Sequence, residues 1–335
     1  MTQEKGLVTL RLETSILLVS FLIAIVLGII IIPILKKLKV GQIERDDGPK
    51  SHLKKQGTPT MGGIIIIITM ILVMTGTYIY FTWNNQNDLA NKLLPMLILT
   101  IGFGMIGFID DFKKLVLKNT EGLKPKYKML GLLIISVIYV LYLIEGLQLG
   151  TGTYIPILKT YIELPIYIYI PFAIFVLLAT TNAVNLTDGI DGLSSSVSSI
   201  IITCLTVIGI LWGVPEVSVF GSMAIGAVLG FLMFNLHPAK VFMGDTGSLL
   251  LGGVISALAL YLKIPLLLIV IALIPVLETL SVMLQVAYYK KTGNRIFKMA
   301  PLHHHFELSG WKESKVVIIF SAITLILCII GLKII

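Results

Sequence analysis

Residues that can do chemistry gather in five short polar segments that separate long apolar runs. The segments are "KKQGTPTMGG" at 54–63, "GFIDDFKK" at 107–114, "NLTDGIDGL" at 185–193, "VFMGDTGSLL" at 241–250 and "APLHHHFE" at 300–307. Aspartates suit Mg²⁺, lysines and histidines suit phosphate, and glycines permit close backbone approach. The combination predicts phosphoryl transfer, in which positioning and charge neutralisation supply most of the catalysis.

The pair Asp110 and Asp111 directly follows an apolar run. Two adjacent carboxylates at membrane depth repel each other, and a divalent cation relieves that cost. A Mg²⁺ site built from one or two carboxylates and substrate phosphates would suit the pair. The alternative is a helix end that meets water and forms ordinary ion pairs with Lys113 and Lys114.

A second acidic group has no basic residue near it in the sequence. Asn185, Asp188 and Asp191 recur at intervals of three, and no lysine or arginine occurs between Lys159 and Lys240. On a helix this spacing places the three side chains along one face, which suits a metal, a sugar hydroxyl or a base edge. Capping of the next helix is the alternative, but capping explains one aspartate and not the whole group.

The remaining segments suit contacts with phosphate. Asp245 lies between two glycines just before an apolar run, where free amides at a helix N-terminus favour phosphate, although Asp245 or Thr246 could also cap that helix. Three consecutive histidines at 303–305 cannot all face one metal from a helix, so contact with a diphosphate fits them better than a zinc site. Lys54 and Lys55 precede a glycine-rich loop that either contacts phosphate or is a turn in a basic loop.

The apolar runs that position these segments show that the solvent is a bilayer. Of 335 residues, 56% are hydrophobic and 13% are charged, and the mean hydropathy is +0.96. This composition excludes an ordinary soluble domain and predicts an all-α polytopic membrane protein with a single integral domain over residues 1–335. About ten transmembrane helices are expected, at 15–35, 62–82, 93–109, 129–147, 166–184, 193–212, 217–236, 247–263, 265–289 and 314–335.

Basic residues predict how the spans are oriented. Nineteen of the 26 lysines and arginines fall in the loops that follow odd-numbered spans. These loops are therefore predicted to be cytoplasmic and both termini extracytoplasmic. All aspartates except Asp88 fall on the same side, so the active site is expected on the cytoplasmic face.

Other classes of protein fit less well. Cys204 and Cys328 lie within apolar runs, which argues against a disulfide framework. An ion-coupled secondary transporter is a distant alternative, because intramembrane acids also mark ion pathways. A transporter would not cluster glycine-rich phosphate-type loops on one face, and no convincing inverted repeat is visible. We expect no nucleic-acid partner.

The five segments resemble, in order and in predicted side, the motifs of the bacterial phospho-N-acetylmuramoyl-pentapeptide transferases. This family belongs to the polyprenyl-phosphate N-acetylhexosamine-1-phosphate transferase superfamily, and the resemblance covers essentially the whole chain, with "GTPTMGG" and "HHHFE" pointing to the muramoyl-pentapeptide branch. It implies a Mg²⁺-dependent, multi-pass enzyme of the bacterial plasma membrane. Such an enzyme transfers phospho-N-acetylmuramoyl-pentapeptide from UDP-MurNAc-pentapeptide to undecaprenyl phosphate, giving UMP and lipid I for peptidoglycan synthesis, cell wall biogenesis, cell shape and cell division.

The resemblance also implies roles for individual residues. Asp245 corresponds to the main Mg²⁺ ligand, with Asp188 as a weaker ligand. The residues implied in catalysis are Asp110, Asp111, Asp188 and His304. The residues implied in substrate binding are Lys55, Thr60, Lys128, Asn185, Asp191, Phe242, Gln285, His303 and His305. Phe242 and Gln285 would border the uridine pocket.

Two mechanisms and one rival donor stay open. In the first mechanism the lipid phosphate attacks the β-phosphorus of the UDP-sugar directly, and Asp110 removes a proton from that phosphate or orients it. In the second an aspartate is the nucleophile and forms a phospho-sugar enzyme. The nearest alternative function is a sister enzyme that makes lipid-linked N-acetylglucosamine phosphate. Membrane lipids are expected partners, and a homodimer is expected by family analogy alone.

Overall fold

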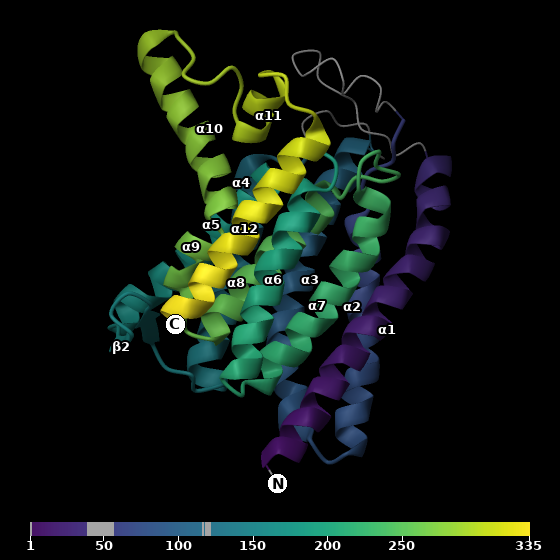
Figure 1. Cartoon of the computed structure of the whole chain (residues 1–335), viewed down its shortest axis with the longest axis vertical. Coiled ribbons are helices and arrows are strands. Elements are labelled where there is room, and N and C mark those ends of the chain that lie inside the picture. The colour runs from purple at the N-terminus through teal and green to yellow at the C-terminus, as the bar shows by residue number, and fades with distance from the viewer. Residues whose placement is uncertain (1, 39–56, 116, 118–121) are drawn as a thin grey trace.

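The computed structural model describes residues 2–38, 57–115, 117 and 122–335, with side chains from residue 12 onward. Within these residues the regular structure is helical, as predicted, with the exception of one short hairpin that was not predicted (Figure 1). Nine of the described helices are long and apolar enough to cross a membrane, and counting one bent pair as a span gives ten. The expectation of about ten candidate spans is confirmed.

Several helices run beyond the apolar core and carry polar segments with them. The nine single spans are α1 (Thr2–Lys37), α2 (Gly63–Trp83), α3 (Asn87–Leu115), α4 (Pro125–Leu141), α5 (Ile166–Thr187), α6 (Leu193–Leu211), α7 (Pro215–Asn235), α8 (Gly244–Tyr261) and α12 (Glu313–Ile334). Proline begins α4 and α7, a position where its missing N–H costs no helical hydrogen bond. Asp110 and Asp111 belong to the last turns of α3, and Asp245 belongs to the first turn of α8.

The ninth predicted span, 265–289, is not one straight helix. A short 3₁₀ turn, η3 (Pro265–Leu267), and α9 (Leu268–Ile271) are followed by α10 (Leu273–Thr292), with a bend of 82° between the two parts. The break is at Ala272, whose backbone angles (φ −106°, ψ 27°) lie outside the helical range. In Figure 1, α10 projects beyond the bundle at the end away from both termini.

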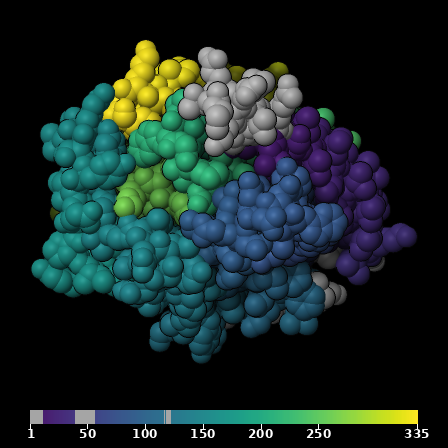
Figure 2. Space-filling model, turned by 90° about the horizontal axis from the view of Figure 1, so that it is seen from below, coloured from purple at the N-terminus to yellow at the C-terminus, as the bar shows by residue number. Residues whose placement is uncertain are grey.

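The loop between the fourth and fifth spans contains a hairpin that the sequence analysis did not predict. A π-helical turn, η2 (Tyr142–Gly146), continues α4, and β1 (Gly152–Ile155) then pairs antiparallel with β2 (Thr160–Glu163). The Tyr154 N–H donates to the carbonyl of Lys263 at 2.8 Å, which fixes the hairpin to the turn after α8. Seen from below in Figure 2, the teal surface of this region adjoins the yellow C-terminal residues.

The core of the bundle is centred on α8. In its most apolar window 89% of the residues are buried, compared with 28% for α1 and for α12. Helices α3, α5 and α6 pack around α8, and α7 packs between α6 and α1. Asp245 is therefore held at the start of the most enclosed helix of the protein.

Two glycines let neighbouring helices reach the start of α8. A Cβ on Gly63, the first residue of α2, would overlap the backbone of Gly247. A Cβ on Gly107 in α3 would overlap the carbonyl group of Asp245. These close backbone approaches bring the glycine-rich segment of α2 and the aspartate pair of α3 to the same turn of α8.

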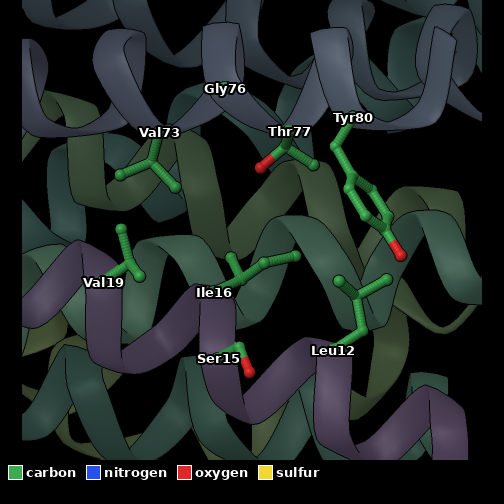
Figure 3. A pocket seen from close by; sticks show the side chains of 8 residues that line it. All are labelled: Leu12, Ser15, Ile16, Val19, Val73, Gly76, Thr77 and Tyr80. Carbon is green, nitrogen blue, oxygen red and sulfur yellow. The ribbon is translucent and has the colours of Figure 1, made fainter. Parts of the chain in front are cut away.

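A cavity of about 180 Å³ lies between α1 and α2 (Figure 3). Its lining is mostly apolar and includes Ile16 and Val19 of α1 and Val73 and Tyr80 of α2. These α2 residues lie in the second half of the helix, whereas Gly63 meets α8 at its first residue. The cavity is therefore separate from the acidic residues.

We expect Gly107→Ala to destabilise the protein, because the added methyl group would overlap the Asp245 carbonyl and push α3 away from α8. Overpacking of this kind costs about 1–3 kcal/mol, so the melting temperature in detergent should fall by several degrees. Gly76→Ala is the matched control, because a Cβ there meets open space and alanine is the better helix former. Equal melting temperatures for the two variants would contradict the predicted contact.

Candidate functional site

Asp111, near the end of α3, accepts hydrogen bonds from the first turn of α8. Its Oδ1 accepts the Asp245 N–H at 3.2 Å, and its Oδ2 accepts the N–H and the hydroxyl of Thr246 at 2.9 and 2.6 Å. The free amides of a helix N-terminus are favourable partners for a carboxylate. Asp111 is 5% exposed and both of its oxygens accept hydrogen bonds, so this contact gives it a structural role. Its predicted catalytic role stays a prediction.

Two lysines bridge Asp110 and Asp245. Lys114 Nζ lies 2.9 Å from Asp110 Oδ2 and 3.2 Å from Asp245 Oδ2. Lys128 Nζ, from the first turn of α4, lies 3.4 and 2.9 Å from the same two oxygens. The Leu123 N–H donates to Asp110 Oδ1 at 2.7 Å. The structure thus brings together residues predicted from two separate segments.

Lys114 was not among the predicted site residues, although the sequence contains a signal for it. It follows Asp110 by four residues, the spacing at which two side chains meet on one helix face. Its second contact, to Asp245, joins residues that are 131 positions apart and could not be read from the sequence.

Asn185 connects the second acidic group to α8. Its Nδ2 donates to Asp245 Oδ1 at 2.7 Å and to Ser248 Oγ at 2.8 Å. Ser248 lies one turn beyond Asp245 on α8 and was not predicted as a site residue. Asp245 is thus contacted by lysines on one oxygen and by an amide on the other, which fixes the plane of its carboxylate.

Asp188, which follows the last residue of α5, has a carboxylate without a hydrogen bond or ion pair to any described residue. Burial raises the pKa of this carboxyl to about 8, with further contributions from the charges of Asp245, Asp111 and Asp191. An acid in this position is stabilised by a cation that joins it, so Asp188 has the properties of a metal ligand. We call Asp110, Asp188, Asp245, Lys114 and Lys128 together the site cluster.

Asp191 lies beside Asp188 in the chain but makes different contacts. Its Oδ2 accepts the Ala239 N–H at 3.1 Å and lies 3.0 Å from His237 Nδ1. The same His237 nitrogen is 3.5 Å from Glu313 Oε2 at the start of α12. The spacing of Asn185, Asp188 and Asp191 predicted that Asp188 and Asp191 share one helix face. The structure places Asp191 against the loop that leads to α8.

The segment before α2 pairs with the segment before α8. The Phe242 N–H donates to the Pro59 carbonyl at 2.8 Å, and the Gly62 N–H donates to the Phe242 carbonyl at 2.9 Å. Thr60 is buried next to Gly244, where an added Cβ would lie 3.0 Å from its hydroxyl oxygen. Thr60 and Phe242 therefore lie close to the first turn of α8, and their predicted contacts with substrate stay predictions. Lys55 falls outside the described residues.

His303 is fully buried and lies against Glu278 of α10. Its Nδ1 is 3.2 Å from Glu278 Oε2 without hydrogen-bond geometry, and its backbone N–H donates to Glu278 Oε1 at 3.1 Å. A Cβ on Gly189 would overlap His303 Nε2, so this ring packs on the segment between Asp188 and Asp191. Glu278 was not among the predicted site residues, although an acid within an apolar run was a signal for it.

The other two histidines of α11 (Leu302–Glu307) face different partners. His304 Nδ1 lies 2.9 Å from Glu307 Oε2, and His305 Nδ1 accepts the Lys298 N–H at 3.1 Å. Three consecutive side chains thus point in three directions, as expected for a helix. The ring centroids of His303 and His304 are 4.1 Å apart with the ring planes inclined at 59°, so the partly exposed His304 ring lies directly beside the buried His303 ring.

Gln285 holds the loop between α10 and α11. Its Oε1 accepts the N–H groups of Ile296 and Phe297, each at 3.0 Å, and its Nε2 donates to the Phe297 carbonyl at 3.1 Å. The amide oxygen and one amide N–H are thus used by the backbone of this loop. The predicted contact of Gln285 with uridine stays a prediction.

Comparison with known proteins agrees with the motifs. A family model described as glycosyl transferase family 4 matches residues 93–263, and phospho-N-acetylmuramoyl-pentapeptide-transferase signature 1 matches residues 55–67. Three curated proteins with the name phospho-N-acetylmuramoyl-pentapeptide-transferase are similar along nearly their whole length. They come from Clostridium acetobutylicum (48% identity, 94% of this chain and 96% of the relative), Clostridium botulinum (50%, 95% and 94%) and Acetivibrio thermocellus (45%, 94% and 93%).

We expect Asp188→Asn to raise the melting temperature in Mg²⁺-free buffer, and to raise it more near pH 8.5 than near pH 5. A folded-state pKa of about 8 means that ionisation of Asp188 opposes folding. This loss of stability is absent below the ordinary aspartate pKa of about 4, grows as the pH rises to about 8 and is complete above it. Asparagine at position 188 removes this loss of stability. Mg²⁺ should reduce the difference in melting temperature between Asp188→Asn and the unsubstituted protein.

The control is Asp88→Asn, because the Asp88 side chain is 81% exposed, in an ion pair with Lys92. Its effect on the melting temperature should be small and similar at both pH values. If the increase in melting temperature caused by Asp188→Asn does not grow with pH, the raised pKa of Asp188 is contradicted.

Proposed function

The chain belongs to the phospho-N-acetylmuramoyl-pentapeptide-transferase family, and we propose that the site cluster performs the reaction of this family. The protein is a multi-pass membrane enzyme of peptidoglycan synthesis that transfers phospho-N-acetylmuramoyl-pentapeptide to undecaprenyl phosphate and forms lipid I. The donor in our proposal is UDP-MurNAc-pentapeptide, and the leaving group is UMP. The observation that carries the proposal is the pair of lysines that bridges Asp110 and Asp245.

The residues present fit a Mg²⁺ ion. Asp188 supplies a carboxylate without a hydrogen bond to any described residue, close enough to Asp245 for the two charges to interact. Hard carboxylate oxygens are the ligands that Mg²⁺ takes, together with phosphates of the substrate. We propose that Asp245 and Asp188 hold the ion. When bound, Mg²⁺ would neutralise charge on the diphosphate and on the departing UMP.

Lys114 and Lys128 are placed to bind phosphate. Each lysine donates to carboxylates of the cluster, and Asp110 holds both ammonium groups next to Asp245. We propose that these ammonium groups turn toward the substrate phosphates when the donor binds. Asp110 then acts by orienting the two lysines. Removal of a proton by Asp110 is not required, because a phosphate monoester has a second pKa of about 6 and is largely dianionic at neutral pH.

The hydrogen bonds of the aspartate pair favour direct attack over a covalent intermediate. Both oxygens of Asp110 and both oxygens of Asp111 accept hydrogen bonds, which lowers the nucleophilicity of these carboxylates. We propose that an oxygen of the lipid phosphate forms a bond with the β-phosphorus of the donor. The bond from that phosphorus to the bridging oxygen breaks, and UMP leaves with the electron pair.

The side of the membrane is part of the proposal. The polar segments meet at one end of the bundle, and their loops carry most of the basic residues. By the positive-inside rule we assign this end to the cytoplasm, where the nucleotide donor is found, and both termini to the other side. The single integral domain and the homodimer stay predictions.

Two rivals are tested together with the main function. A sister enzyme would use UDP-N-acetylglucosamine as the donor, and a transporter would release no UMP. We expect UMP release that requires both Mg²⁺ and undecaprenyl phosphate, with UDP-MurNAc-pentapeptide preferred over UDP-N-acetylglucosamine.

Substitutions in the site cluster should lower UMP release strongly. We expect Asp245→Asn, Asp188→Asn and Asp110→Asn to lower kcat by about 10³-fold or more, because each disturbs groups that stabilise charge in the transition state. His304→Ala should lower kcat as well. Asp88→Asn at the other end of the bundle is the control and should keep normal turnover. Near-normal turnover of Asp245→Asn would refute the assignment of the site.

The choice between the two mechanisms has its own measurement. The enzyme is incubated with labelled donor and Mg²⁺ in the absence of undecaprenyl phosphate, quenched and analysed by mass spectrometry. We expect no phospho-sugar adduct on any aspartate. A covalent adduct that then reacts with added lipid acceptor would overturn direct attack.

A further inference from the structure

Three segments that are distant in the sequence meet at the imidazole of His237. His237 follows the last turn of α7, Asp191 precedes α6, and Glu313 is the first residue of α12. His237 Nδ1 lies 3.0 Å from Asp191 Oδ2 and 3.5 Å from Glu313 Oε2. The two carboxyl side chains are 2% and 7% exposed, whereas the imidazole is 49% exposed. We call these three residues the histidine bridge.

The neighbours of His237 assign its proton. Nδ1 faces two carboxylate oxygens, which only accept hydrogen bonds, so this nitrogen carries the hydrogen. The 3.0 Å contact has hydrogen-bond geometry and identifies Asp191 as the acceptor, whereas Glu313 lies 3.5 Å from the same nitrogen as an ion-pair contact. His237 thus lies between the start of α12 and the segment that contains Asp188 and Asp191.

On one side the histidine bridge is attached to the segment that carries the three histidines. Phe306 of α11 packs on Trp311 with ring centroids 4.7 Å apart, and on Phe320 of α12 at 5.8 Å. These contacts join α11 to α12 as one unit. Glu313 lies between the two aromatic contacts in the sequence and connects this unit to His237.

On the other side the histidine bridge is attached to the loop that ends at Asp245. Asp191 Oδ2 also accepts the Ala239 N–H at 3.1 Å. Asn235 Nδ2 donates to the Val241 carbonyl at 3.0 Å, and the next residue, Phe242, pairs with the segment before α2. The loop is therefore fixed at successive points from Ala239 to the start of α8.

We propose that His237 and Glu313 are positioning residues that hold the α11–α12 unit against Asp191 and the loop before α8, and so set the width of the donor site. This inference rests on the proposed function, because it assumes that the donor lies between the histidines of α11 and the site cluster. It adds two residues that neither the motifs nor the family resemblance singled out.

The proposal predicts an effect on donor binding more than on the chemical step. Among the described residues, His237 Nδ1 and the Ala239 N–H both contact Asp191 Oδ2, and neither belongs to the site cluster. Without the histidine bridge, the α11–α12 unit and the loop before α8 can move apart. Donor binding must then restore the spacing between them. The reacting groups at Asp110 and Asp245 keep their contacts.

The test measures UMP release at varied donor concentration in the full-length enzyme. We expect His237→Ala to raise the KM for the donor about tenfold, the size expected for loss of one charge-assisted hydrogen bond, with kcat within about twofold. His237→Gln should restore most of the affinity, because its amide has two N–H donors for the two carboxylates. The control is Glu163→Gln in β2, at the other end of the molecule (Figure 1).

A double-mutant cycle separates the bridge from two independent effects. If Glu313 acts through His237, Glu313→Gln combined with His237→Ala should raise the KM no further than His237→Ala alone. Additive effects would overturn the proposal, as would an unchanged KM in His237→Ala or a loss of kcat alone. Melting temperatures of all variants check that each one is folded.

The outcome is distinguishable from failure of the proposed function. Normal turnover of Asp245→Asn would refute the site cluster, whatever the His237 variants do. A normal KM in His237→Ala together with an inactive Asp245→Asn would refute the histidine bridge and leave the site cluster in place.

Discussion

The N-terminus of α8 is the point on which the arrangement of the site depends. This helix is the most enclosed span, so its free amides cannot all reach water, and unpaired amides in such a place are costly. Asp111 of α3 meets this need by accepting hydrogen bonds from Asp245 and Thr246. Gly107, one turn earlier, has no side chain to keep the helices apart. The solution to a packing problem thus places Asp110 beside Asp245.

That placement brings several carboxylates close together, and neighbouring cationic and amide groups offset only part of their negative charge. Four acidic side chains, Asp110, Asp111, Asp188 and Asp245, gather at one end of the bundle, and the repulsion among them is expensive in a medium of low dielectric constant. Lys114 and Lys128 offset the charge of two of these acids, and the amides of α8 offset a third. The fourth, Asp188, has a raised pKa and no hydrogen bond to a described residue. The proposed Mg²⁺ ion would offset this remaining negative charge.

The walls around the cluster are held by hydrogen bonds between loops. The segment before α2 pairs with Phe242, Asn235 fixes Val241, and the histidine bridge attaches α12 to Asp191. Most of these contacts use backbone groups or buried side chains, and none of those cited involves Lys114 or Lys128. Loops held in this way suit a reaction in which positioning supplies most of the catalysis.

The sequence by itself determined the class of protein, the approximate spans, the five chemical segments and the family, because hydropathy and motifs are local properties of the chain. It also pointed to Asp110, Lys128, Asn185 and Asp245, which the structure brings together. Only the tertiary structure decided that Asp111 accepts hydrogen bonds from the first turn of α8. It also decided that the ninth span bends by 82° and that Asp191 is hydrogen-bonded to the loop before α8. The Asp111–Thr246 contact joins residues 135 positions apart. Such a pairing depends on how small residues let helices approach, which no local pattern encodes.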